Sequence, residues 1–102
     1  MAGFGSEGAS EEPELAALAS KWSEGSFKSV GGSLAYHFGE HGEEVAAKDL
    51  LQYLRKADSF ASNLQRSRVI QQEGGTVKFI KNGRYIIKDI EGKILTFGLA
   101  RD

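Results

Sequence analysis

The chain has 102 residues, enough for one domain, and carries a formal net charge of −1. It contains no Cys, which excludes disulfides, thiolate catalysis and Cys-ligated metal centres. No apolar run approaches the ~20 residues of a membrane-spanning helix, and no basic region followed by an apolar stretch opens the chain. We therefore expect no membrane contact, and export only as part of a longer chain.

Charge is unevenly divided along the sequence. Residues 1–47 contain eight acidic and two basic residues, whereas residues 48–102 contain six acidic and eleven basic ones. A positive C-terminal half is suited to facing a polyanion. A solvated surface of mixed charge explains the same numbers, so charge alone does not decide between these interpretations.

Gly, Ala, Ser and Glu make up most of residues 1–11, which we expect to be a disordered lead or linker. Residues 12–102 are expected to form a single α+β domain. Pro13 can occupy the first turn of a helix, and apolar residues at helical spacing follow it as far as Trp22. A loop is expected over residues 23–26.

A second helix is expected to begin between Ser29 and Ser33 and to end at His41. Leu34, His37, Phe38 and His41 then share one face, and Gly42 is a suitable residue just beyond the C-terminus.

The clearest predicted helix follows Asp49. Asp49 and Gln52 have the spacing of a capping box, and a continuous apolar stripe runs from Leu50 to Leu64. This helix should end between Asn63 and Arg66.

Beyond residue 68 the hydrophobic period changes from 3.6 to 2. Asn82-Gly83 is a strong type I′ hairpin signal that joins strands expected over residues 76–81 and 84–89. A three-residue loop, 90–92, then leads to a strand over residues 93–99. The expected fold is therefore α+β, with N-terminal helices followed by a small antiparallel β-meander.

These turns predict which residues share a face of the sheet. In this register Tyr85 lies opposite Phe97, and Ile86 lies opposite Thr96. The predicted core face carries Ile80, Tyr85, Ile87, Leu95 and Phe97. The predicted polar face carries Lys81, Arg84, Lys88 and Thr96, around Phe79, Ile86 and Ile94.

His37 and His41 are the only histidines, four residues apart on one predicted helix face. Three interpretations stay open: a protonated pair favoured by the helix C-terminus, an acid/base pair for proton transfer, and a metal site. The third rests on His37-Phe38-Gly39-Glu40-His41, which matches the H-x-x-E-H pattern of zinc peptidases. Such a site needs a third ligand, for which Glu44 is a candidate.

Basic residues of the predicted hairpin form a second candidate group. Arg84 can bind phosphate through two parallel hydrogen bonds, with Lys81 and Lys88 on the same predicted face. Thr96 can donate to a phosphate oxygen. Protection of an edge strand by lysine explains the same residues without a ligand.

Four segments together resemble one family. They are Ser33-Leu34-Ala35-Tyr36-His37-Phe38-x-x-His41-Gly42-x-Glu44-Val45, Gln52-Tyr53-Leu54-Arg55-Lys56-Ala57-x-x-Phe60, Lys81-Asn82-Gly83-Arg84-Tyr85-Ile86 and Gly92-Lys93-Ile94-x-Thr96-Phe97-Gly98. In order and spacing these segments resemble the C-terminal toxin domains of bacterial polymorphic toxins, of the contact-dependent-inhibition and Rhs types. Those domains are similar to the barnase, colicin D and RelE-like ribonucleases. The resemblance covers residues 22–99.

The resemblance implies a metal-independent ribonuclease toxin domain with no cofactor, acting on tRNA and leaving a 2′,3′-cyclic phosphate. It implies that His37, His41, Arg84 and Thr96 are catalytic. Lys81, Lys88 and Tyr85 would bind the substrate. The sequence departs from the family at Glu40, where Lys is frequent, and at Ala46, where Gly is usual.

A toxin domain of this kind acts in the cytoplasm of a target cell and is paired with a cognate immunity protein, so we expect a monomer outside that complex. The alternative function is a non-catalytic module that binds a protein or a nucleic acid. A position for Arg84 on the opposite side of the domain from both histidines would favour this alternative.

Overall fold

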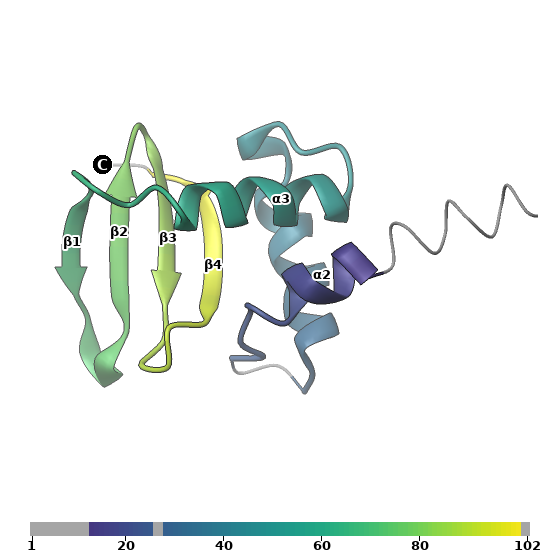
Figure 1. Cartoon of the computed structure of the whole chain (residues 1–102), viewed down its shortest axis with the longest axis horizontal. Coiled ribbons are helices and arrows are strands. Elements are labelled where there is room, and N and C mark those ends of the chain that lie inside the picture. The colour runs from purple at the N-terminus through teal and green to yellow at the C-terminus, as the bar shows by residue number, and fades with distance from the viewer. Residues whose placement is uncertain (1–12, 26–27, 101–102) are drawn as a thin grey trace, which may run out of the picture.

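The computed structural model describes residues 13–25 and 28–100. The predicted linker at residues 1–11 lies outside them. The fold is α+β, with N-terminal helices followed by a four-stranded antiparallel sheet in the order β1-β2-β3-β4. Figure 1 shows the helices gathered at the β4 end of this sheet. After a first helix over residues 13–19, the elements are α2 (Val30–His41), η1 (Glu43–Val45), α3 (Leu50–Ala61), β1 (Arg68–Gln71), η2 (Glu73–Gly75), β2 (Val77–Lys81), β3 (Arg84–Lys88) and β4 (Ile94–Leu99).

The helices begin at the residues whose side chains can cap them. Ser29 accepts a hydrogen bond from the Gly32 amide at the start of α2. Asp49 accepts one from the Gln52 amide at the start of α3, as the capping-box pattern predicts. The Gln52 side chain reaches back to the amide of Lys48 at 2.8 Å, one residue before the cap. α3 ends at Ala61, two residues earlier than expected.

The segment that follows α2 differs from the prediction that Gly42 ends the helix. α2 ends at His41 as expected, but Gly42 is right-handed (φ −57°, ψ −45°), so the chain continues into the short helix η1. The reversal comes at Ala46, which is left-handed with φ 60° and ψ 35°. A left-handed alanine costs roughly 1–2 kcal/mol because its Cβ crowds the following carbonyl. Glycine at this position avoids that cost.

We therefore expect Ala46→Gly to raise the free energy of unfolding by about 1 kcal/mol, since glycine adopts the left-handed conformation without strain. The matched control is Ala35→Gly, at an exposed position inside α2, which should lower that free energy by about 1 kcal/mol. Urea unfolding of both variants measures the difference. A loss of stability in Ala46→Gly would contradict the assigned conformation.

The hairpin between β2 and β3 forms as predicted. Asn82 and Gly83 both have positive φ, at 53° and 76°, as a type I′ turn requires. Lys81 pairs with Arg84, and Ile80 pairs with Tyr85. The strand β1 was not predicted.

The register between β3 and β4 differs from the prediction. The residues of β4 from Thr96 onward therefore lie on the face of the sheet opposite to the predicted one. Lys88 pairs with Ile94 as expected, but the register then shifts at Ile87/Lys88, and Ile87 pairs with Thr96. The extra residue on β4 is a bulge, which places two residues opposite one. Ile86 therefore lies opposite Phe97, not Thr96. The predicted assignment of side chains to the two faces was wrong from this point on.

Burial identifies the true core face of the sheet. Ile86 and Phe97 are fully buried and Ile94 almost so, whereas Ile80, Tyr85, Ile87 and Leu95 are only partly buried. We call the face that carries Phe79, Ile86 and Phe97 the α3 face, because α3 packs on it. The opposite face carries Tyr85, Thr96 and Gly98. We call it the histidine face, because the His41 ring packs against Tyr85 there.

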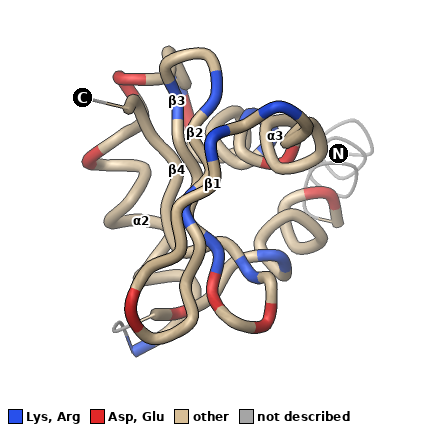
Figure 2. Tube along the Cα trace, turned by 90° about the vertical axis from the view of Figure 1, so that its left-hand side faces the viewer, with Lys and Arg blue, Asp and Glu red and all other residues tan. Residues whose placement is uncertain are grey.

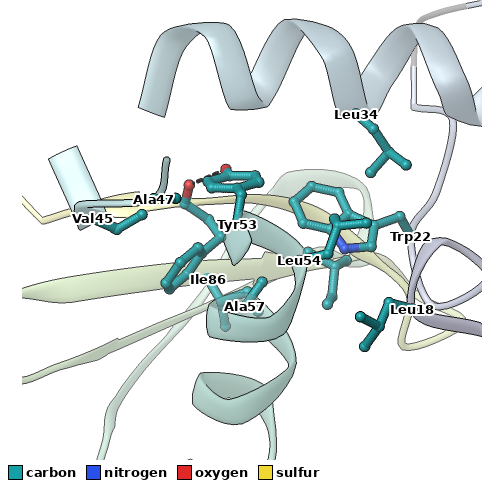
Figure 3. Close-up of a cluster of buried hydrophobic side chains, with 11 residues drawn as sticks. Leu18, Trp22, Leu34, Val45, Ala47, Tyr53, Leu54, Ala57 and Ile86 are labelled. Carbon is teal, nitrogen blue, oxygen red and sulfur yellow. Dashed lines mark hydrogen bonds between the residues drawn. The ribbon is translucent and has the colours of Figure 1, made fainter. Parts of the chain in front are cut away.

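The core lies between α3, α2 and the sheet (Figure 3). Tyr53 is fully buried, its ring lies 5.7 Å from that of Phe97, and its hydroxyl donates to the Phe97 carbonyl. Burial raises the pKa of Tyr53 well above its ordinary value, so the phenol stays protonated. Trp22 fixes the N-terminal segment by a parallel bridge to Ile94. Within residues 13–25 and 28–100, no helix has both the length and the apolar character needed to span a bilayer.

Candidate functional site

The C-terminal end of α2 holds a hydrogen-bonded imidazole and carboxylate. His41 Nδ1 lies 2.9 Å from Glu44 Oε1, and both side chains are largely buried. The same carboxylate oxygen accepts a hydrogen bond from the Leu99 amide at 3.1 Å. Because an ionised carboxylate only accepts, Nδ1 of His41 is the donor, and Nε2 is left for proton transfer. Glu44 thus fixes both the tautomer and the orientation of the ring.

This pair rests directly on the β4 backbone at Gly98. A Cβ built on Gly98 would lie 2.9 Å from His41 Nδ1, closer than real Cβ atoms come, and 3.0 Å from Glu44 Oε1, which is a very tight contact. Gly98 pairs with Tyr85 across the sheet, so its open side belongs to the histidine face. Glycine is therefore required here for the end of α2 to approach the sheet.

Tyr85 and Lys78 extend this site across the strands. The Tyr85 ring lies edge-on to the His41 ring, with 6.3 Å between centroids. Lys78 Nζ lies 4.8 Å from the centroid of the Tyr85 ring, within the range of a cation–π contact. The Tyr85 phenol thus lies beside His41, and the Lys78 ammonium lies against the Tyr85 ring on the same face of the sheet.

His37 lies one helical turn before His41 on the same face of α2. The two imidazoles are stacked, with an interplanar angle of 11° and 6.1 Å between centroids. Trp22 and Tyr36 flank His37, at 6.2 Å and 5.2 Å between ring centroids. Burial, and then the neighbouring His41, hold the pKa of His37 below its ordinary value, against the opposing effect of Glu40. His37 is therefore mostly neutral at neutral pH and able to accept a proton.

Thr96 belongs to the same face, two residues before Gly98 on β4. Its Oγ1 is buried and has no hydrogen-bond partner among the residues that the structure describes. A buried hydroxyl without a partner is costly, and such groups in native proteins call for an explanation. Because this oxygen has almost no accessible surface, a ligand can hydrogen-bond to it only after the side chains that cover it move.

The three basic residues expected beside Thr96 lie on the opposite face. Arg84 and Lys81 point to the side on which α3 packs, where they line a hollow with Phe60 of that helix. Lys88 Nζ lies 5.9 Å from the ring centroid of Phe79, which is also on the α3 face. The expected grouping of Arg84 with Thr96 and the histidines is therefore wrong. The bulge in β4 places Thr96 on the histidine face, whereas Arg84 lies on the α3 face.

The H-x-x-E-H pattern does not bring a third ligand to the histidines. Among residues 13–25 and 28–100, no three His, Asp or Glu side chains are grouped so that they could hold a metal ion. Glu44, the third ligand considered from the sequence, is instead hydrogen-bonded to His41.

Sequence reasoning assigned no role at this site to Lys78 and considered Glu44 only for a metal. The i, i+3 spacing of His41 and Glu44 is a signal for contact within a helix, but Gly42 suggested that the helix had ended. Lys78 lies opposite Ile87, which the correct β4 register places on the face of Thr96.

The comparisons with known proteins add no assignment. Neither a scan against protein-family models nor a search of curated proteins gives a match for this chain.

Proposed function

We propose that this chain is a metal-independent ribonuclease toxin domain that cleaves RNA at the histidine face. The observation that carries the proposal is the pair of stacked imidazoles on α2, one of them oriented by Glu44. A pair of imidazoles can supply the general base and the general acid for cleaving a ribose phosphodiester without a metal. The hydroxyls of Tyr85 and Thr96 and the cation of Lys78 lie on the same side of the sheet.

The reaction is an internal transfer of the phosphoryl group. One imidazole removes the proton from a ribose 2′-hydroxyl, and the 2′-oxygen forms a bond to the adjacent phosphorus. The bond from phosphorus to the 5′-oxygen breaks, and the other imidazole protonates that leaving oxygen. The products are a 2′,3′-cyclic phosphate and a free 5′-hydroxyl. The neutral His37 is suited to accept the first proton.

Lys78 takes the part that the sequence suggested for Arg84. Negative charge grows on the non-bridging oxygens as the new bond forms, and a fixed cation or hydroxyl nearby stabilises it. On the histidine face, Lys78 Nζ supplies the cation. Thr96 Oγ1 supplies a hydroxyl once a bound substrate displaces the side chains that cover it. Lys78 is a point charge, so it neutralises a phosphate without the paired hydrogen bonds that arginine provides.

The resemblance of residues 22–99 to polymorphic-toxin domains supports the same function. It adds tRNA as the substrate, the cytoplasm of a target cell as the place of action, and a cognate immunity protein as the partner. The position of Ala46 agrees with this resemblance, since a residue that the family usually has as Gly is left-handed here.

The position of Arg84 favours a second candidate, a non-catalytic module that binds a protein or a nucleic acid. Arg84 lies on the α3 face, whereas His41 packs on the opposite face with His37 stacked on it. These side chains therefore do not converge on one phosphate. In this case the histidine face would bind its partner without chemistry.

One experiment separates these functions. Purified protein is incubated with total tRNA in EDTA, and the ends of the products are analysed. We expect cleavage that leaves 2′,3′-cyclic phosphate ends. Intact tRNA after long incubation would favour the binding module, and cleavage that requires added zinc would favour the H-x-x-E-H interpretation.

A further inference from the structure

A cationic hollow lies on the α3 face, behind the histidine face. Its volume is about 460 Å³, and it lies between the C-terminal half of α3 and the turn that joins β2 to β3. It is lined by Lys56, Ser59, Phe60, Asn63, Lys81, Asn82 and Arg84. Three of these residues are cations and none is acidic.

The nearest acidic residue of α3 is already neutralised elsewhere. Asp58 pairs with Lys21 at 2.5 Å and lines a different hollow. Within this hollow, Lys81 Nζ donates to the carbonyl of Asn63 at 2.7 Å, an uncharged acceptor that leaves the lysine charge uncompensated. The hollow thus carries positive charge that its own lining does not balance.

A second hollow continues this surface round the end of the sheet. It shares Lys81 and Asn82 with the first and adds Arg66 and Arg68, together with Ile80. Ile80 pairs with Tyr85 and so belongs to the histidine face. We call the cations of both hollows (Lys56, Arg66, Arg68, Lys81 and Arg84) the cationic band. Figure 2 shows blue positions along the β2–β3 hairpin and on the chain that joins α3 to β1.

The band reaches both faces of the sheet: Arg84 lies behind the histidine site, whereas Arg68 pairs with Ile80 and so belongs to the histidine face. Arg84 and Tyr85 are consecutive residues of β3, with side chains on opposite faces. A flexible chain that passes round the Asn82-Gly83 turn can therefore contact both. A stiff duplex or a single phosphate cannot.

We propose that the cationic band binds the phosphate backbone of single-stranded RNA some nucleotides away from the bond at the histidine face. This inference rests on the proposed function, because it gives the RNA substrate a second contact. A line of separate cations suits phosphates repeated along a strand. The amides of Asn63 and Asn82 supply hydrogen bonds to sugar or phosphate oxygens between them.

The test is binding of a fluorescent 2′-O-methyl RNA of about a dozen nucleotides, long enough to cover an ordinary single-strand site. The 2′-O-methyl group prevents cleavage, so binding is measured apart from catalysis. The test variant is Lys56→Gln with Arg84→Gln, and the control is Lys48→Gln with Lys93→Gln. Lys48 and Lys93 are exposed and line neither hollow of the band, and each double variant removes the same charge.

We expect the test variant to bind the RNA at least tenfold more weakly and the control to bind as the wild type does. The slope of log affinity against log salt should fall by about 1.4 in the test variant, since each lost phosphate contact on a single strand contributes about 0.7. Equal losses in test and control variants would overturn the proposal. Displacement of the RNA by polyglutamate of equal charge would also overturn it, because the ligand of the band would then be an acidic polypeptide.

Failure of this inference is distinct from failure of the proposed function. If the protein cleaves tRNA but its RNA affinity does not depend on Lys56 and Arg84, the proposed function stands and the proposed role of the cationic band is wrong. If the cationic band binds RNA but the protein leaves tRNA intact, the ribonuclease proposal is wrong and the RNA-binding role of the band stands.

Discussion

We expect His41→Ala to lower the rate of RNA cleavage by about 10²–10⁴-fold, the usual contribution of a positioned acid or base. His41 is the imidazole that the structure holds most firmly, between Glu44, Gly98 and Tyr85. Its side chain is outside the hydrophobic core, so the variant should keep its fold. The measurement is single-turnover cleavage of tRNA in EDTA, with circular dichroism as the check of folding.

Glu44 allows a sharper form of this test, because it acts through His41 and does not touch the substrate. Glu44→Gln keeps the acceptor for the Leu99 amide but loses the charge that holds His41 Nδ1–H. We expect its cleavage rate to lie between those of the wild type and His41→Ala. The double variant should be no slower than His41→Ala alone, because groups that act as a unit are not additive.

The matched control is Glu43→Gln, which removes the same charge from the exposed neighbour of Glu44. It should cleave as the wild type does. A loss in Glu43→Gln equal to that in Glu44→Gln would mean that charge near the end of α2 matters in general, and that Glu44 does not orient His41.

The class of fold could be predicted from local patterns because each pattern has a local cause. A side-chain cap begins α3 at Asp49, and positive φ at Asn82 and Gly83 sets the β2–β3 register. Contacts of this kind depend on residues within a few positions of one another. The short edge strand β1 was missed because its burial does not alternate, and Val69 is 53% exposed.

The candidate site could be predicted only in part, because it depends on a bulge. The loop 90–92 gives the correct pair Lys88–Ile94, but the extra residue comes after that pair and moves every later partner by one. Ile94 and Phe97 are both buried although three positions separate them, an arrangement that a regular strand does not allow. The turn sets the pair Lys88–Ile94, and burial of Phe97 against α3 sets the register of the rest of β4. Arg84 was separated from Thr96 as a result.

Two neighbouring residues of β4 test that register by opposite effects. We expect Phe97→Ala to lower the free energy of unfolding by about 3–5 kcal/mol, as for other fully buried phenylalanines. Its ring packs on Tyr53 at 5.7 Å and on Phe60 at 5.5 Å, so truncation leaves a cavity under α3. Urea unfolding measures this loss.

Thr96→Val keeps the shape of its side chain and removes the buried hydroxyl that has no partner in the described part of the chain. Replacing such a group by an apolar one of the same shape is nearly neutral or stabilising, so Thr96→Val should unfold at the urea concentration of the wild type or above it. Its cleavage rate should fall about 10²–10³-fold, the usual cost of one preorganised donor to a charged transition state. A large loss of stability in Thr96→Val, with little in Phe97→Ala, would instead place Thr96 against α3. The histidine face would then lose its hydroxyl, and the ribonuclease proposal would lose one of its supports.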